Sequence, residues 1–549
     1  MEKETRQKVQ FSTMAIILIV IFCIGISPKI LQNDTFYTIK IGEYILENGV
    51  TMTEPFAWHQ NLEYTFPHWG YDVLIFLVYK LWGMLGIYIS TIALASILGI
   101  TMYVVNVKLA KNRVLSFIIT ILGLWLLSPY ICARAQLVTF ILFILTIYFI
   151  EKFLDTKKIR YAIALIIIPI LIANLHVATF YFYFILYLPY IAEYMIYILV
   201  YSNVIVSGSI IEMLKRKIEK TGETEELKEK LQREEERYKK LKDKQDMKVK
   251  HPYKIVMENR NSIRWLVLIF IICLFAGLLT PLKSVPYTYL IKTMKGISTK
   301  NISEHLPLTL ANDFKTLILL MSAIFITGFT KAKVRLSDLF MFLGLTILAL
   351  FSRRQVSMLV LIGFVILNRE LTGVLTAYKG NILKKAESIL STIPAIIGIS
   401  IIVVSISIWQ FNKKKDDPYI DPASYPVDAA TWINENLDVE QIKLYNEYNF
   451  GSYLIYQNIP VFVDSRCDLY LPEFNKDVYV FKDFLNLSGF NLSYDGMREK
   501  IDNYGFTHFL VTNGSRFRHY LDFHPGEFRI IYPTEDAKDS NFTIYERIK

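Results

Sequence analysis

Apolar runs of about 20 residues, the length that spans a bilayer as a helix, recur from Phe11 to Gln410 of this 549-residue chain. The chain is 53% hydrophobic and only 20% charged, whereas soluble domains average about 25% charged residues and lack repeated long apolar runs. We therefore predict a polytopic α-helical membrane protein with about 11 transmembrane helices. The predicted spans are residues 11–31, 84–107, 114–130, 136–153, 160–175, 177–201, 263–281, 315–330, 337–352, 355–370 and 389–410.

The loops between these spans alternate in character. One set is rich in Lys and Arg, as at Lys108–Arg113 and Lys331–Arg335, and such short basic loops mark the cytoplasmic face. We therefore expect a cytoplasmic N-terminus and place the other set of loops outside the cell. That set carries the polar residues best suited to catalysis or ligand binding, namely Asp34, His59, His68, Arg134, His176, Glu304, Arg353 and Arg354.

Two segments stand apart from the spans. Residues 202–262 form a long, highly charged insertion, for which we predict a cytoplasmic helical hairpin or a single charged helix supported by ion pairs four residues apart. Residues 412–549 are predicted to form an extracytoplasmic α/β domain, leaving 1–411 as the transmembrane domain. The expected strands of the 412–549 domain are 442–445, 461–464, 508–512, 528–532 and 542–545, and its expected helices include 425–437 and 496–504.

The net charge and the number of cysteines further restrict the class of protein that the chain can belong to. The net charge of +10 arises from the basic loops of the membrane part, while the tail is acidic, so we do not expect a nucleic-acid partner. Four cysteines are too few for a disulfide framework, which favours a bacterial or archaeal chain over a eukaryotic secreted one. We expect a multi-pass protein of the cell membrane.

The strongest local pattern is the stretch Asp34–Leu46, which follows the first span directly. Further motifs follow in order: residues 54–58, His68-Trp69, residues 134–136, residues 173–176 and, in the tail, residues 462–466. In order and sidedness this pattern resembles the GT-C superfamily, membrane glycosyltransferases that use polyprenyl-phosphate-linked sugars. The resemblance spans nearly the whole chain and is nearest to a bacterial branch with a soluble C-terminal domain.

The resemblance implies a sugar transfer at the outer membrane face, to a glycan, lipid or protein acceptor. Asp34 is the expected base that removes the proton of the attacking hydroxyl. Arg134, Arg353 and Arg354 are expected to bind the donor phosphate, whose negative charge grows as the bond breaks. His59, His68, His176 and Glu304 are expected to support the site, and a divalent metal ion is a candidate cofactor.

Alternative readings remain open at this point. Asp34 is also suited to capping the following helix, and Arg353–Arg354 to anchoring lipid head groups. Asp464 and Arg466 are expected to form a buried pair that holds a turn. Asp34 has no acidic neighbour, which favours a second function: a non-catalytic scaffold or translocation component that binds lipid-linked glycans. An ion-coupled transporter is disfavoured, because the predicted spans hold few acidic residues.

Overall fold

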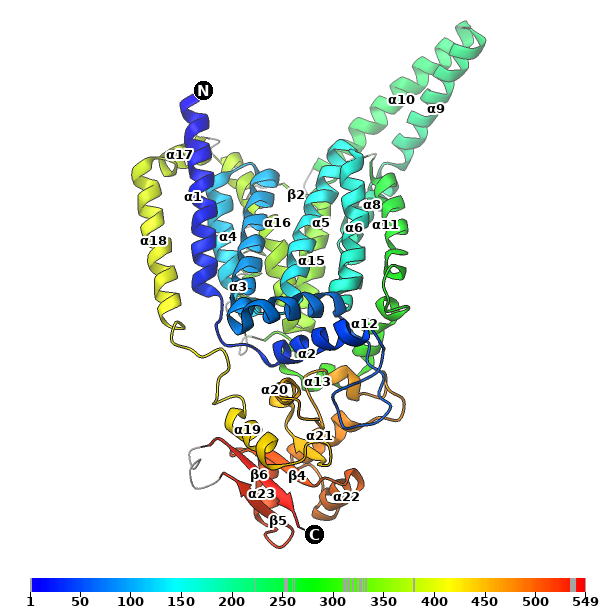
Figure 1. Cartoon of the computed structure of the whole chain (residues 1–549). Helices are drawn as coiled ribbons and strands as arrows, with labels where there is room; N and C mark the ends of the chain where they lie inside the picture. The colour runs from blue at the N-terminus through cyan, green and yellow to red at the C-terminus, as the bar shows by residue number, and fades with distance from the viewer. Residues whose placement is uncertain are drawn as a thin grey trace.

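A computed structural model shows a helical bundle with different structures at its two ends (Figure 1). The N-terminus and a long hairpin of α9 and α10 lie at one end, which we call the hairpin-bearing end, and the C-terminal β-sheet lies at the other, the sheet-bearing end. The structure describes residues 2–222, 224–250, 255–258, 260, 262–309, 313, 316–317, 320–321, 323–324, 328, 330, 333–378, 381–533 and 540–548.

Among these residues, seven helices are long and apolar enough to cross a membrane. Their apolar segments are Val9–Ile26, Trp69–Ala110, Arg113–Tyr130, Gln136–Thr156, Val177–Val200, Arg353–Thr376 and Ile393–Asn412. Three shorter apolar segments, Ile159–Leu175, Ile263–Leu278 and Leu336–Phe351, coincide with other predicted spans. The predicted span 315–330 lies largely outside the described residues, so the total of 11 spans stays a prediction.

The bundle helices are continuous over most of the predicted spans. They are α1 Glu2–Ile26, α3 Trp69–Ala110, α4 Arg113–Leu127, α5 Gln136–Thr156, α6 Ile159–Leu175, α7 Phe180–Ile185, α8 Leu188–Val200, α11 Ile263–Cys273, α15 Leu336–Phe351, α16 Val356–Tyr378, α17 Asn381–Leu390 and α18 Ile393–Asn412. Helix α3 bends at Gly83, where φ is 58°, a conformation that glycine adopts without steric cost. The bend separates the first part of α3 from the predicted span 84–107.

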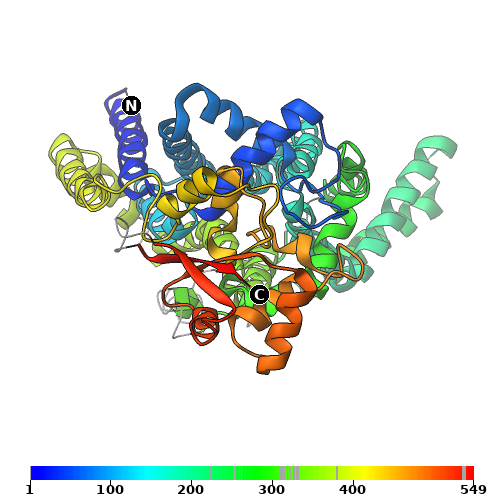
Figure 2. The same ribbon diagram turned by 60° about the horizontal axis from the view of Figure 1, so that its bottom comes forward.

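Helix α2 (Asn33–Asn48) and the first part of α3 run across the ends of the bundle helices, as Figures 1 and 2 show. They bury one face against each other, and the close approach is visible at Gly42: a Cβ there would lie 2.2 Å from the backbone oxygen of Asp72. Two short helices, α12 (Val285–Lys295) and α13 (Ser298–Asn301), lie at the same end. This layer carries the candidate site.

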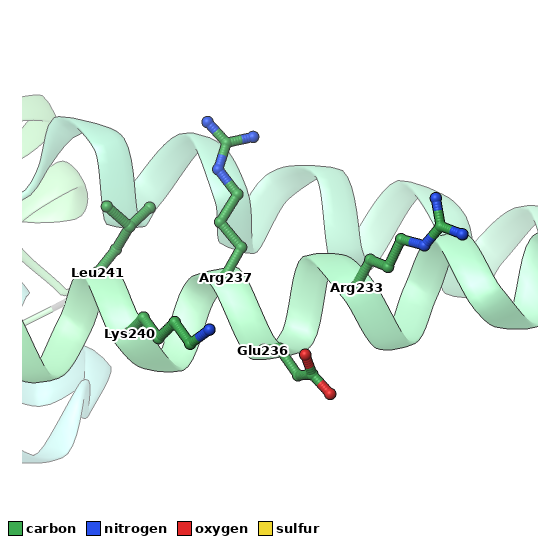
Figure 3. A pocket seen from close by; sticks show the side chains of 5 residues that line it. All are labelled: Arg233, Glu236, Arg237, Lys240 and Leu241. Atoms are coloured by element: carbon green, nitrogen blue, oxygen red, sulfur yellow. The ribbon is translucent and has the colours of Figure 1, made fainter.

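The charged insertion is a hairpin of two helices, α9 (Ser202–Thr221) and α10 (Glu225–Lys250). The predicted pairs Glu226–Lys230 and Glu229–Arg233 are present on α10. One shallow hollow on α10 is lined by Arg233, Glu236, Arg237, Lys240 and Leu241 (Figure 3). These side chains point in different directions around the helix, and the hollow lies far from the sheet-bearing end. After the hairpin, β1 (Ile255–Val256) pairs in parallel with β2 (Val334–Arg335).

The C-terminal segment contains a four-stranded mixed sheet in the order β3-β4-β6-β5. The strands are β3 Leu444–Asn446, β4 His508–Thr512, β5 Phe528–Tyr532 and β6 Phe542–Arg547, and the helices are α19 Val427–Asn436, α20 Gly451–Tyr456, α21 Val480–Ser488, α22 Tyr494–Tyr504 and α23 Arg516–Asp522. Four of the five predicted strands are therefore confirmed. The fifth, 461–464, is no strand: Val461 forms only an isolated bridge, with Ala57.

That bridge reflects how the C-terminal segment is held. One hydrophobic core joins buried residues of α2 and the 49–68 loop, such as Phe36 and Phe66, to buried residues of the tail, such as Tyr453 and Phe462. A second core fills the helical bundle. The boundary at residue 412 stays a prediction, but the tail is packed onto the ends of the bundle rather than tethered beside it.

Candidate functional site

The polar residues singled out in the sequence come from five loops and helix ends at the sheet-bearing end. Asp34 lies in the first turn of α2, Arg134 precedes α5, and His68 precedes α3. His176 follows α6, and Arg353–Arg354 form a short 3-10 turn between α15 and α16. The fold therefore brings together residues that are separated by up to 320 positions in the sequence.

Asp34 forms an ion pair with Arg134. The Nη2 atom of Arg134 donates to Oδ2 of Asp34, and Nη1 lies 3.5 Å from Oε1 of Glu304. The residue at the N-cap of α2 is Gln32, whose side chain forms no capping hydrogen bond. Asp34 is therefore not the N-cap residue, and that alternative is wrong. The carboxylate still lies in the first helical turn, where the helix dipole favours negative charge.

Arg134 is largely withdrawn from water. Burial by itself lowers the pKa of this guanidinium, but the carboxylates of Asp34 and Glu304 oppose that effect and raise the pKa above its ordinary value. Arg134 is therefore a permanent cation in this site. Its Nε atom is buried and has no hydrogen-bond partner among the described residues, so part of its donor capacity is unused.

Arg353 and Arg354 are held at the site by their backbone. The backbone N–H of Arg353 donates to the carbonyl of Leu306 at 2.9 Å, and its carbonyl accepts from the Tyr130 hydroxyl at 2.9 Å. Within the described part of the chain, neither guanidinium forms an ion pair or a hydrogen bond. The charge of Arg354 is nonetheless felt nearby, since after burial it is the strongest influence that lowers the pKa values of His176 and His305, the latter to about 4.

Two of the three predicted histidines lie together. The rings of His68 and His176 are 6.4 Å apart, edge to face. His176 is buried, its Nδ1 lies 2.8 Å from the Thr139 hydroxyl, and burial lowers its pKa well below the ordinary value. His176 is therefore neutral at physiological pH and does not compete with the arginines for an anion.

His59 lies elsewhere, against the C-terminal segment. Its Nε2 is 2.8 Å from the carbonyl oxygen of Phe462, and its ring stacks on Trp58 at 4.3 Å. Burial lowers its pKa to about 4. The structure does not bring His59 into contact with the ion pair at Asp34.

A buried ion network holds the tail next to this site. Arg466 donates to both carboxylate oxygens of Glu54, in the 49–68 loop, and to Asp464 at 2.7 Å. Glu54 and Asp464 have fully buried side chains, and the Tyr470 hydroxyl donates to Asp464 as well. The expected Asp464–Arg466 pair is confirmed, and its link to Glu54, 412 residues away, had no sequence signal.

The tail also contributes groups that the sequence analysis missed. Asp468 accepts a hydrogen bond from the Tyr289 hydroxyl of α12, and burial raises its pKa. The carboxyl of Asp468 lies within electrostatic range of Arg354. The backbone carbonyl of Tyr448 accepts from the Asn33 side chain at 3.2 Å, next to Asp34. The site therefore has contributions from both the bundle ends and the tail.

A second polar cluster at the hairpin-bearing end was not foreseen. Glu151 on α5 and Asp338 on α15 are buried within apolar helices. They pair with three arginines, Arg260, Arg335 and Arg369. Glu193 and Glu370 are buried in predicted spans as well. The signal was present in the sequence as single acids inside apolar runs.

The described residues contain no group of three or more His, Cys, Asp or Glu side chains arranged to hold a metal ion. Comparisons with known proteins add no further constraint: no protein-family model matches the chain, and no curated protein matches it.

Proposed function

We propose that the chain is a glycosyltransferase that moves a sugar from a polyprenyl-phosphate-linked donor to an acceptor hydroxyl at the sheet-bearing end. The observation that carries this proposal is the charge arrangement there. The ion pair Asp34–Arg134 and the charge of Arg354 all lie within electrostatic range of the Cys132 thiol. Neither Arg353 nor Arg354 forms an ion pair within the described residues. An amphipathic anion such as a lipid phosphate suits a cationic site at the ends of apolar helices.

In this proposal the arginines bind the phosphate and stabilise the charge that it gains. The acceptor oxygen attacks the anomeric carbon, the bond from that carbon to the phosphate oxygen breaks, and the electron pair leaves with the lipid phosphate. Fixed guanidiniums placed around the leaving group lower the barrier of such a step. The acceptor loses its proton to a base in the site, for which Asp34 is the first candidate.

The ion pair gives donor binding a second role. Arg134 engages Asp34 while no phosphate is present. The phosphodiester of the donor competes for that guanidinium, because it offers several acceptor oxygens and gains a second negative charge as its bond to the sugar breaks. Binding of the donor then releases one carboxylate oxygen of Asp34 for the acceptor proton. The base becomes available only when the donor is in place.

The positive-inside rule supports an orientation with the sheet-bearing end outside the cell membrane and the hairpin-bearing end in the cytoplasm. Cysteine substitutions near Lys240 and in the tail test it. We expect a membrane-impermeant reagent to label the tail position and not the position near Lys240; the reverse pattern would overturn the orientation.

Purified protein incubated with radiolabelled polyprenyl-phosphate sugars and candidate acceptors tests the function. We expect label transfer by the parent and a loss of about 10²–10⁴-fold in Asp34→Asn, the usual scale for removal of a general base. Glu43→Gln, which removes a half-buried carboxylate of the same helix paired with Lys40, is the matched control and should transfer as the parent does. Full activity of Asp34→Asn would remove the proposed base.

A second candidate is a non-catalytic scaffold or translocation component that binds lipid-linked glycans. The ion pair between Asp34 and Arg134 favours this second candidate, because an ion-paired carboxylate is a poor base. It predicts donor binding without transfer to any acceptor, in both the parent and Asp34→Asn.

A further inference from the structure

His68, Asp72 and Tyr37 form a hydrogen-bonded chain that the sequence analysis did not anticipate. Nδ1 of His68 lies 2.7 Å from Oδ1 of Asp72, and Nε2 lies 3.2 Å from the Tyr37 hydroxyl. The ring of Tyr37 also stacks on the imidazole, with centroids 5.8 Å apart and an interplanar angle of 25°. The imidazole is thus held by the carboxylate of Asp72 and by the hydroxyl and ring of Tyr37.

Local structure fixes the order of this chain. His68 is the residue before the first turn of α3, and Asp72 lies one turn later, so their side chains meet on one helix face. Asp72 is fully buried, and its other oxygen, Oδ2, has no hydrogen-bond partner among the described residues. Burial raises the pKa of Asp72, and His68 is the strongest influence that opposes this effect, followed by the side chain of Thr38 and the charge of Arg466. A proton on Nδ1 that is donated to the carboxylate leaves Nε2 as the acceptor of the Tyr37 O–H.

Tyr37 connects the chain to the ion pair. Asp34 and Tyr37 are three residues apart on α2 and share one face of that helix. Burial raises the pKa of Tyr37 well above its ordinary value, with Asp34 as the next cause and Arg134 opposing. The phenol therefore keeps its proton, and its hydroxyl lies within electrostatic range of both members of the ion pair.

We infer that Tyr37 and His68 form a proton relay that takes the proton of the acceptor hydroxyl, with Asp72 as the positioning residue that sets the histidine tautomer. As the acceptor oxygen bonds to the anomeric carbon, its proton passes to the Tyr37 oxygen and the Tyr37 proton passes to Nε2 of His68. The imidazolium so formed is stabilised by Asp72. The phosphate leaves with its electron pair, and no further reactant is needed.

This inference rests on the proposed glycosyltransfer and assigns its proton. It gives the proton a destination that does not depend on breaking the Asp34–Arg134 pair. The relay replaces Asp34 as the acceptor of the proton, and Asp34 then serves to hold Arg134 until the donor arrives. A buried Asp–His pair in which the carboxylate sets the imidazole tautomer is an established way to make a neutral base effective.

The kinetic test uses the parent and two variants in the label-transfer assay. Tyr37→Phe keeps the ring and its packing but removes the hydroxyl, and Asp72→Asn keeps the size but removes the charge. We expect each to lower kcat by about 10²–10⁴-fold with donor affinity unchanged, while the control Glu43→Gln behaves as the parent. If Tyr37→Phe transfers sugar as fast as the parent, the relay is wrong and the proposed function still stands.

A spectroscopic test separates the relay from the proposed function. Nitrogen-15 NMR of histidine-labelled protein, with His68→Gln to assign the signal, reports which ring nitrogen carries the proton. We expect the parent His68 to carry it on Nδ1 and Asp72→Asn to shift the tautomer. A proton on Nε2 in the parent would overturn the relay, whatever the outcome of the transfer assay. Absence of transfer by the parent would overturn the proposed function and with it the catalytic role of the relay, and the expected tautomer would then show only how Asp72 orients His68.

Discussion

Each end of the bundle has a cluster of three arginines, but the guanidiniums of the two clusters have different partners. At the hairpin-bearing end, Arg260, Arg335 and Arg369 all bond to Glu151, and the last two bond to Asp338 as well. At the sheet-bearing end, the two paired carboxylates both engage Arg134. Arg353 and Arg354 have no ion pair in the described part of the chain. In the first cluster every guanidinium has an ion-pair partner, although Nε of Arg369 has no hydrogen-bond partner among the described residues. In the second cluster two of the three guanidiniums have no ion-pair partner there.

This difference separates a structural role from a binding role. Buried charges are tolerated when each has a partner, and a fully paired cluster leaves nothing for a ligand to gain. Unpaired guanidiniums near a surface gain most when an anion arrives. The hairpin-bearing cluster therefore holds α5, α15 and α16 together, and anion binding by the sheet-bearing cluster is our proposal.

The largest expected effect on stability comes from the hairpin-bearing cluster. Glu151→Gln removes the carboxylate that three arginines share. Loss of one partner from a buried ion pair costs about 3–5 kcal/mol, so we expect a marked drop in melting temperature in detergent and in folded yield. An unchanged melting temperature would show that the two clusters do not differ in the way described here.

A smaller effect is expected from the matching change at the other end. Glu304→Gln removes an acid whose side chain is 51% exposed and lies 3.5 Å from Arg134. An exposed pair contributes about 0–1 kcal/mol, and Arg134 keeps Asp34. The melting temperature should stay within about 2–4 °C of the parent value. A loss as large as that of Glu151→Gln would mean that Glu304 is structural.

The sequence predicted the helices and strands of the chain better than it predicted the contacts between them. Periodic apolar runs and β-rich segments predicted most of the helices and four strands, because both follow from local residue patterns. The segment 461–464 failed as a strand because its partner is the loop at Ala57, a long-range pairing without a local pattern.

The candidate site shows the same limit. Loop charge placed Asp34, Arg134 and Arg354 in loops on one side, and the fold brings them to one end, but no spacing rule predicts that Asp34 and Arg134 form a pair across 100 residues. The spacing of His68 and Asp72, four residues apart at a helix start, was readable as a helical pair. His59 is a histidine predicted to lie in the same outer loop as His68, yet its position is determined by its contact with Phe462 of the tail.

The most direct test of the central claim is the affinity of purified protein for polyprenyl phosphate, measured for the parent and for the double variant Arg353→Lys and Arg354→Lys. Lysine keeps the charge, which is all that lipid anchoring requires, but cannot grip a phosphate bidentately. Uncharged polyprenol should bind both proteins alike. Arg160→Lys, at an exposed arginine that stacks on Tyr161, is the charge-matched control.

We expect the double variant to bind polyprenyl phosphate roughly 10–100-fold more weakly than the parent, the loss of one or two charge-assisted hydrogen bonds. Its membrane insertion and yield, and the affinity of the control variant, should be unchanged. Equal affinity of the double variant and the parent would contradict phosphate recognition by Arg353 and Arg354.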